Sequence, residues 1–281
     1  MTTITAKVLA HSYNPETEND VVTFELEYPL VIHAHVLTHR VFSRNTASQR
    51  AIPIKTMIKS VKENPYIPMH WGKNQPGMVA MGEEVDDIEN AIQNWLYARD
   101  NAVAVAEHLD SIGVHKQYTN RLLAPWQHTK VVLTTTDLDN FFTLRLGSDA
   151  QPEVQALAMV MKAAYEESTP RVLTDGEWHL PYIDWVEDFK LEGAKPPVLQ
   201  YQGQEVTLEQ AKAISAACCA AISYRAEGMT IEKALDIYEK LGVGTEHFHA
   251  SPFEHVCTPW QEWEEVEKGN LVGFHQLRHL L

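Results

Sequence analysis

A polar segment in the first fifth of the chain concentrates side chains that could do chemistry. Between Thr38 and Arg50, thirteen residues include three arginines, one histidine and several hydroxyl and amide groups. Arginine makes bidentate, permanently charged hydrogen bonds to phosphate oxygens, and hydroxyl groups and helix-end amides complete the donor shell of such an anion. The segment therefore fits a phosphate or diphosphate ligand. The alternative is a solvated helix end with ordinary ion pairs.

Histidines and acids suggest a second possibility, a metal site. The groups with suitable residue types are His35 with His39, and His247, His249 and His255 with Glu246 and Glu254. Neither group contains the His-Glu-x-x-His pattern of zinc enzymes, and a histidine pair without a third ligand is more often structural. We therefore expect no metal, and metal catalysis stays a remote alternative.

The charge of the whole chain limits its partners. In 281 residues, 23 Lys and Arg against 38 Asp and Glu give a net charge of -15. A general duplex-binding surface needs the opposite sign, so we expect no nucleic acid partner. The three cysteines, two of them adjacent, do not suit a disulfide framework, and no apolar run approaches the ~20 residues of a membrane helix. The sequence predicts a cytoplasmic protein without a membrane partner.

Hydrophobic patterns indicate the elements that position the polar segment. Residues Thr23–Tyr28 alternate polar and apolar side chains and predict a strand that Pro29 ends. Residues Leu30–Phe42 have helical spacing, and the polar run Ser43–Arg50 reads as a helix end or a loop. Residues 64–82, rich in Pro and Gly, predict a long irregular loop of the kind that often covers a site.

The remaining elements alternate along the chain. We expect helices at Asp87–Leu109, 153–167, 208–222 and 231–241, and a strand at Lys130–Thr136. Thr207 and Gln210 form a capping-box pattern. We expect one α/β domain over 1–281, made of parts 1–174, 175–206 and 207–281. The middle part is a packed connection with the aromatic residues Trp178, Tyr182, Trp185 and Phe189.

Three blocks of sequence resemble the flavin-dependent thymidylate synthases, the ThyX family. His39-Arg40 through Arg50 is similar to the family signature, in which Arg-His-Arg is followed by Ser, Asn and a final Arg at these spacings. A second block resembles the region of the substrate-activating arginine: Asn120–Pro125, Thr134–Arg145 and Asp149–Glu153. The third block, Ile222–Arg225 with His249–His255, resembles segments that precede the signature in the common family order.

Because the third block comes last here, the resemblance is to a circularly permuted member of the family. Permutation is tolerated when the parental termini lie near each other at the surface. The resemblance implies a ThyX-like fold, with an antiparallel or mixed sheet core flanked by long helices. If the protein is encoded by a phage, the location is the host cytoplasm.

Matching positions imply a role for each site residue. The deoxyuridine nucleotide (dUMP) positions are His35, Thr46, Ser48, Gln49, Arg50, Arg121 and Arg145. The FAD positions are Thr38, His39, Arg40, Asn140, His249, Ser251 and Glu254. Three features depart from the family pattern: Thr38 replaces the first Arg of the signature, His35 replaces a glutamine, and the stretch near Thr135 and Thr136 lacks the usual Asn-Ala-Arg.

The implied reaction is the reductive methylation of dUMP to dTMP. Methylenetetrahydrofolate donates the one-carbon unit, FAD supplies hydride, NADPH recharges the flavin, and a homotetramer builds each site from several subunits. Arg145 is the expected catalytic residue, because a permanent cation stabilises negative charge that develops on the pyrimidine. Ser48 is expected to position the substrate, since a nucleophilic serine needs an adjacent base and His39 is assigned to the flavin.

Two other functions remain open on the same scaffold. The enzyme could make a different C5-modified nucleotide, such as hydroxymethyl-dUMP, or the protein could bind nucleotides without catalysis. The segment Gly176–Pro181 is interpreted either as aromatic packing beneath a loop or as a lid or subunit contact.

Overall fold

A five-stranded mixed sheet forms the centre of the computed structural model, which describes residues 2–77, 80, 82–174, 176–186, 197–223, 228–260 and 269–281. Phe189, Tyr224 and Arg225 lie outside these residues. The strand order is β3-β4-β2-β1-β5, with bounds Ser43–Thr46, His128–Thr135, Asn19–Pro29, Thr5–Asn14 and Arg171–Val172. The pairs are antiparallel except β1 with β5, which is parallel. The expected α/β class with a mixed sheet is confirmed.

The strands β2 and β4 follow their sequence patterns. In β2, Phe24, Leu26 and Tyr28 are fully buried in the core and Pro29 is the last residue, as predicted. The strand β1 has no clean alternation of buried and exposed residues. Its register against β2 shifts between Val8 and Ala10, and such an irregularity interrupts the two-residue period that identifies a strand. The sequence pattern therefore did not predict β1.

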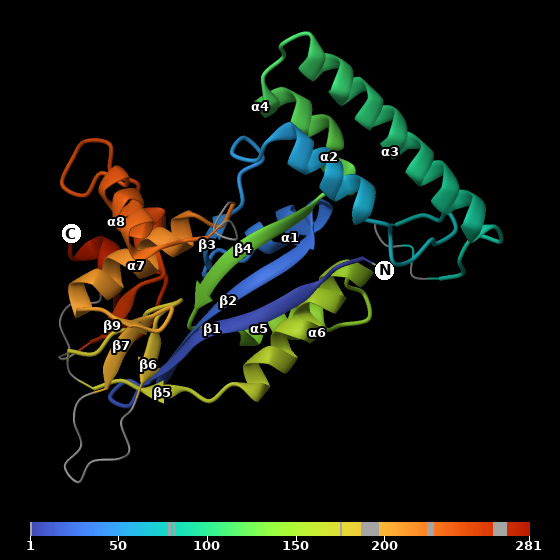
Figure 1. The fold of residues 1–281 in the computed structure, drawn as a ribbon. Helices are drawn as coiled ribbons and strands as arrows, with labels where there is room; N and C mark the ends of the chain where they lie inside the picture. Colours follow the sequence, from blue (N-terminus) through green and yellow to red (C-terminus); the bar gives the residue numbers. More distant parts are fainter. Residues whose placement is uncertain are drawn as a thin grey trace.

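Helices α5 (Asp139–Arg145) and α6 (Pro152–Glu167) cover one face of this sheet (Figure 1). Phe141 of α5 and Leu157 and Met161 of α6 share a core with Phe24 and Leu133 from the strands. The predicted helix 153–167 is confirmed, with Val154, Leu157 and Met161 buried. The packing fixes α5, whose last residue is Arg145, against the sheet.

The opposite face carries the C-terminal part of the chain. Helix α7 (Leu208–Ala220) starts with the predicted capping box and packs against α8 (Ile231–Lys240), which begins after the N-cap Thr230. Trp178 and Tyr201 are buried in the same core as Phe253, so the connection is packed in its described part. The connection also contains a small three-stranded sheet of β6 (Asp184–Val186), β7 (Val198–Tyr201) and β8 (Gln204–Glu205). Closer to the end of the chain, β9 (Cys257–Pro259) pairs with β10 (Phe274–Gln276) in a separate two-stranded sheet.

A helical lobe stands at the other end of the sheet (Figure 1). It consists of α2 (Ile54–Glu63), α3 (Ile88–Ser111), α4 (Lys116–Thr119) and the 3₁₀ segment η2 (Asn120–Trp126). Met57, Val61, Val103 and Leu123 form its core. The long helix predicted from Asp87 is confirmed, with Asp87 as N-cap. No element was predicted for α2.

Two expectations around the signature were wrong in part. The helix expected over Leu30–Phe42 is a 3₁₀ turn η1 (Leu30–Ile32) followed by the short helix α1 (His33–Leu37). The polar run expected as a helix end or loop contains β3, which pairs with residues 131–134 of β4. Hydrogen bonding to a neighbouring strand overrides the local preference of a polar sequence, and that partner cannot be read from the segment itself.

The loop predicted at 64–82 is irregular in its described part, where Gly72 forms an isolated bridge with Glu84. Within the described residues, no helix combines the length and the apolar character required to span a membrane.

Candidate functional site

Arg145 lies at the centre of a first group of predicted site residues. Its Nε donates to Nε2 of His39 (3.1 Å), and its Nη2 donates to Oγ1 of Thr38 (3.4 Å). These contacts join the end of α5 to the turn that follows α1. They hold the plane of the guanidinium and leave its other N–H groups for a ligand.

His39 is held as a neutral acceptor. Its ring stacks on Phe42 and meets the edge of Phe141, at centroid distances of 5.5 and 5.0 Å. Burial lowers the pKa of His39, and the charges of Arg145 and Arg44 lower it further, against a smaller opposing effect of Asp137. Because Nε2 accepts from Arg145, the proton of the neutral ring is on Nδ1.

A cavity of about 650 Å³ opens beside Arg145. Its lining includes His35, Tyr66, His70, Trp71, Arg145 and Asp149. The cavity brings two predicted dUMP residues, His35 and Arg145, together. The expectation that the 64–82 loop covers a site gains support, because that loop supplies the aromatic wall.

Glu153 fixes this wall, and sequence reasoning missed its role. Its buried carboxylate accepts from the Tyr66 hydroxyl and from the backbone N–H of Met69, both at 2.9 Å. The Gln151 amide donates to its other oxygen at 2.9 Å. Burial raises the pKa of Tyr66 well above its ordinary value, and Glu153 raises it further, so the hydroxyl remains a donor. The only sequence signal was the position of Glu153 at the start of an otherwise apolar helix face.

A second group of predicted residues lies around the turn after β3. The backbone N–H of Ser48 donates to Oγ of Ser223 (2.7 Å), and the Gln49 side chain donates to Gln127. Asn120 donates to the carbonyl of Gln49 (2.7 Å), which places Arg121 beside this turn. Arg50 and Arg121 are both exposed, so their cations are accessible to a phosphate.

A third group comes from the end of the chain. The 3₁₀ segment η4 (Ser251–Glu254) packs on β3, and Gln276 bridges them by donating to Oγ of Ser43 (3.1 Å) and to the carbonyl of Glu254 (2.9 Å). The Glu254 carboxylate pairs with Arg278. The predicted flavin segment therefore lies against the signature strand. The other predicted flavin positions are exposed: Arg40, Asn140, His249 and Ser251.

The first and second groups belong to opposite faces of the sheet. Strand side chains alternate between faces: Leu133 packs toward α5, whereas Val132 packs toward the end of α7. Arg145 belongs to the α5 face, while Ser48 is bonded to Ser223, just beyond α7. Thr46 links β3 to the first face through a 3.5 Å contact with His33. The predicted site residues of one chain therefore lie in two separate groups.

A buried polar chain ties the C-terminal segments to the sheet. Oγ of Ser12 lies 2.9 Å from Nδ1 of His179, and Nε2 of that ring lies 2.8 Å from Oγ1 of Thr23. Thr23 contacts Thr134 (2.6 Å), which contacts Nδ1 of His255 (2.8 Å). Burial lowers the pKa of both histidines to about 3, so both rings are neutral. With Trp178 in the core, the packing interpretation of Gly176–Pro181 holds for this part of the segment.

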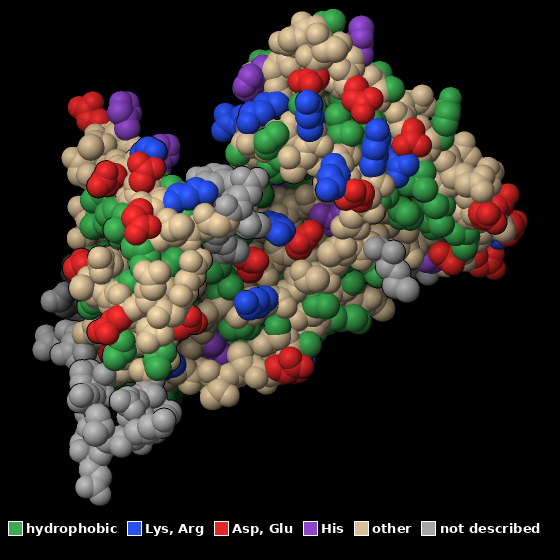
Figure 2. Space-filling model, in the orientation of Figure 1, with side chains coloured by type: hydrophobic (Ala, Val, Ile, Leu, Met, Phe, Trp, Pro, Cys, Tyr) green, Lys and Arg blue, Asp and Glu red, His purple; other side chains and the backbone are tan. Residues whose placement is uncertain are grey.

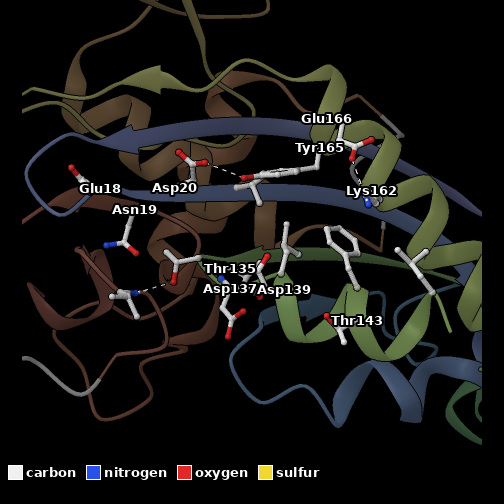
Figure 3. Close-up of a pocket in the computed structure, with 16 residues that line it drawn as sticks. Glu18, Asn19, Asp20, Thr135, Asp137, Asp139, Thr143, Lys162, Tyr165 and Glu166 are labelled. Carbon is white, nitrogen blue, oxygen red and sulfur yellow. Dashed lines mark hydrogen bonds and ion pairs between the residues drawn. The ribbon is translucent and has the colours of Figure 1, made fainter.

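The larger of the two main described cavities contains none of the predicted site residues. It has a volume of about 970 Å³, and five acids and one lysine line it: Glu18, Asp20, Asp137, Asp139, Glu166 and Lys162. Figure 3 shows Asp20 turned toward Tyr165, which donates to it at 3.0 Å. Its excess of carboxylates does not suit an anionic nucleotide, so we place the candidate site at the smaller cavity.

The described residues do not gather around a metal. Within them, no three His, Cys, Asp or Glu side chains are arranged to hold an ion. His255 is buried and bonded to Thr134, whereas His247 and His249 are exposed. The three cysteines are buried, and burial raises the pKa of Cys257, so its thiol stays protonated.

Comparison with known proteins gives consistent matches for the first part of the chain. A family model described as thymidylate synthase complementing protein (Thy1) matches residues 2–171. The flavin-dependent thymidylate synthase of Thermosipho africanus is 27% identical over 168 residues, which cover 58% of this chain and 71% of that protein. The enzyme of the same name from Thermosipho melanesiensis is 26% identical, covering 58% and 70%.

Among solved structures, a UMP/dUMP methylase from Streptomyces cacaoi, bound with 5-Br dUMP, is similar to part of this chain. The similarity has a TM-score of 0.49 and 16% identity, and it covers 59% of this chain and 91% of the other.

Proposed function

Because the chain belongs to the thymidylate synthase complementing protein family, we propose that it methylates dUMP reductively to dTMP with a flavin cofactor. The observation that carries the proposal is the contact of Arg145 with the signature residues Thr38 and His39 beside one cavity. Thr38 and His39 thus contact Arg145, which lies more than a hundred positions further along the chain, and they fix the orientation of its guanidinium. The one-carbon donor is methylenetetrahydrofolate and the reductant is NADPH.

The donor set around β3 fits FAD. The segment η4 lies against β3, which carries Arg44. Ser251 at the start of η4 and His249 just before it are exposed. Hydroxyl, imidazole and carboxylate groups suit the ring edge and ribityl chain, and the nearby arginines suit the diphosphate. When bound, FAD supplies the hydride that reduces the transferred one-carbon unit. Thr38, His39, Arg40, Asn140, His249, Ser251 and Glu254 would hold it.

In this reaction, Arg145 stabilises the negative charge that develops on the pyrimidine carbonyls and N3. Neutral His39 makes this possible: it accepts from Nε without adding a positive charge, so the guanidinium is oriented and remains fully cationic. His35 and the Tyr66–Trp71 wall enclose the ring and exclude water. The buried cysteines take no part.

The nucleotide phosphate belongs at the second group. Arg50 and Arg121 offer exposed cations, and the Ser48 hydroxyl and Gln49 offer neutral donors around the turn. The Ser48 backbone is held by Ser223, which fixes the turn for binding. We assign Ser48 to positioning, since no base is bonded to its hydroxyl among the described residues.

Two separate groups of predicted site residues on one chain support a homo-oligomer that completes each site between subunits. The proposed assembly is a homotetramer. Helix α3 and its C-cap Ile112 offer a surface for it: Tyr97, Val105 and Ile112 are 68%, 50% and 63% exposed. Exposed apolar surfaces of this kind are typical of protein contacts.

We further infer that the chain is one permuted domain. The contact of η4 with β3 supports this, because it returns the last block to the signature that it precedes in the common family order. A cytoplasmic location is part of the same proposal, since three cysteines, two of them adjacent, do not suit a disulfide framework.

The proposal is tested by purifying the protein and following two signals. We expect a yellow protein with a flavin absorption spectrum, and release of tritium from 5-tritiated dUMP that requires both methylenetetrahydrofolate and NADPH. A protein that binds dUMP but releases no tritium when reconstituted with FAD would refute the activity.

A further inference from the structure

A row of lysines follows the exposed face of α2, next to the proposed phosphate site. Lys55, Lys59 and Lys62 are all exposed, and the first acid of the helix is its last residue, Glu63. Figure 2 shows Lys and Arg side chains gathered over α2 and α4, in a chain whose net charge is -15. This local charge is opposite to that of the chain as a whole.

The spacing aligns the three lysines. Positions i, i+4 and i+7 lie on one side of a helix, and a rise of 1.5 Å per residue separates the first and last by about 10 Å along the axis. The opposite side of α2, with Met57 and Val61, is buried in the helical lobe. The ammonium groups therefore form a line in solvent that an extended anion can follow.

The line begins at the second group of site residues. Lys116 donates to the carbonyl of Ala51 (3.0 Å), and Asn120 donates to the carbonyl of Ile52 (2.9 Å), just before α2 starts. Lys116 therefore lies beside the start of the helix, and Arg50 and Arg121 are sequence neighbours of the residues that these bonds join. At its far end Lys62 lies 3.3 Å from Glu107, and both side chains are exposed.

We propose that Lys55, Lys59 and Lys62 bind the γ-glutamyl tail of the folate substrate. The inference rests on the proposed function, which makes a folate the one-carbon donor. A polyglutamyl tail carries free carboxylates at regular intervals on a flexible chain, and lysines on flexible stems suit such mobile point charges. Once the pterin is held in the site, the tail reaches the lysines as an intramolecular ligand.

NADPH is a second anionic ligand that could bind these lysines. Its negative charges are on compact phosphates, whereas those of the folate tail are on separated carboxylates. Compact phosphates favour the planar fork of arginine, whereas a line of separated ammonium groups matches repeated single charges. We therefore assign the stripe to the folate tail, and the test includes NADPH as a separate arm.

The test compares monoglutamyl with pentaglutamyl methylenetetrahydrofolate. Exposed ion pairs are weak individually, so three of them should lower KM for the pentaglutamyl form by about tenfold in the unaltered protein. In a Lys55→Gln, Lys59→Gln, Lys62→Gln variant this ratio should fall to near one. Glutamine and lysine have similar helix propensities, so α2 is expected to remain folded.

Two controls separate charge from other effects. The matched Lys→Arg variant at the same three positions keeps the charge and should keep the preference for the long tail. Raised ionic strength should reduce the preference in the unaltered protein, because salt screens exposed charges. KM for NADPH should be the same in the triple Lys→Gln variant as in the unaltered protein.

Equal KM values for the two folates in the unaltered protein would overturn the inference while leaving the proposed function in place. A Lys→Gln variant that keeps the preference, or one that raises KM for NADPH alone, would also overturn it. Absence of dTMP with either folate would instead overturn the proposed function, and this inference with it.

Discussion

Arg145 makes hydrogen bonds to Thr38 and His39, so contacts within the chain itself set the orientation of its guanidinium. Such preorganised donors act on charge that appears only in the transition state. The replacement of the usual first signature Arg by Thr38 fits this arrangement, because a hydroxyl can accept from Arg145 where a second cation could only repel it.

Replacing Arg145 by alanine should lower turnover by about two to three orders of magnitude, with fold and flavin content retained. Steady-state kcat, far-ultraviolet circular dichroism and the flavin spectrum measure these effects. An Arg145→Lys variant keeps the charge but loses the fork, so it should recover only part of the rate. Near-normal turnover in the alanine variant would refute the role of Arg145.

At this scale the sequence was informative where residues fall within recognisable blocks. It predicted Arg145, Thr38 and His39 as site residues separately, and the structure brings these three residues into contact. It did not identify Glu153 as the anchor of the cavity wall or His179 as a buried link. Those roles depend on partners far along the chain, and a single sequence contains no signal for such pairs.

At the scale of elements, the buried polar chain through His179 and His255 connects the two C-terminal segments to three strands of the sheet. Thr23 of β2 and Thr134 of β4 lie between the two rings, and Ser12 of β1 ends the chain of contacts. Both rings must stay neutral, because a buried imidazolium without a carboxylate partner is costly.

We predict a loss of stability in mild acid from this feature. The pKa of each ring is about 3 in the folded protein and about 6.5 in an unfolded chain. Between these values the unfolded state binds more protons, so the free energy of unfolding falls as pH drops through the window. Urea unfolding at about pH 7 and pH 5 measures the change.

A His179→Gln variant is the matched control, since its amide offers a donor and an acceptor but does not titrate. It should lose less stability between the two pH values than the unaltered protein does. An equal loss in both proteins would show that this ring does not contribute to the pH dependence.

Helices and strands with a regular hydrophobic pattern were predicted well. A strand that forms only because it pairs with a neighbouring strand was not. The strand β2 has an alternating pattern, and the helices α3, α6, α7 and α8 have helical patterns. Helices α3, α7 and α8 also have N-cap side chains that accept from the backbone. The strand β3 is polar and short, so only its pairing with β4 makes it a strand. The bulge in β1 removed the alternation that would have revealed it.

At the scale of the whole molecule, the two groups of predicted site residues on opposite faces of the sheet support a site that a second copy of the chain completes. Arg145 would come from one copy, and Arg50 with Arg121 from another. A closed symmetric assembly repeats the same contact between its copies. Each copy would therefore contribute Arg145 to one site and Arg50 with Arg121 to another.

Mixing two inactive variants tests this arrangement. Arg145→Ala and Arg50→Ala, co-expressed with different affinity tags, should recover about a quarter of full activity, because half of the pairs are mixed and one site in two is then intact. Each variant expressed alone under both tags is the control. A mixture that is no more active than its components would place both arginines in a site within one chain.

The proposed permutation also makes a whole-molecule prediction. A chain in which residues 207–281 precede residue 2, joined by a long flexible linker, should fold and retain activity. Long flexible loops cost little extra closure entropy, and the start at Thr207 preserves the cap of α7. A soluble rearranged protein that binds flavin but gives no turnover would contradict the equivalence of the two orders.

The identity of the nucleotide product is the most direct test of the account. The purified protein, reconstituted with FAD, is incubated without oxygen with dUMP, methylenetetrahydrofolate and NADPH, and the nucleotides are analysed by mass spectrometry. We predict dTMP, formed only when all three substrates are present. Unchanged dUMP, or hydroxymethyl-dUMP as the sole product, would contradict it.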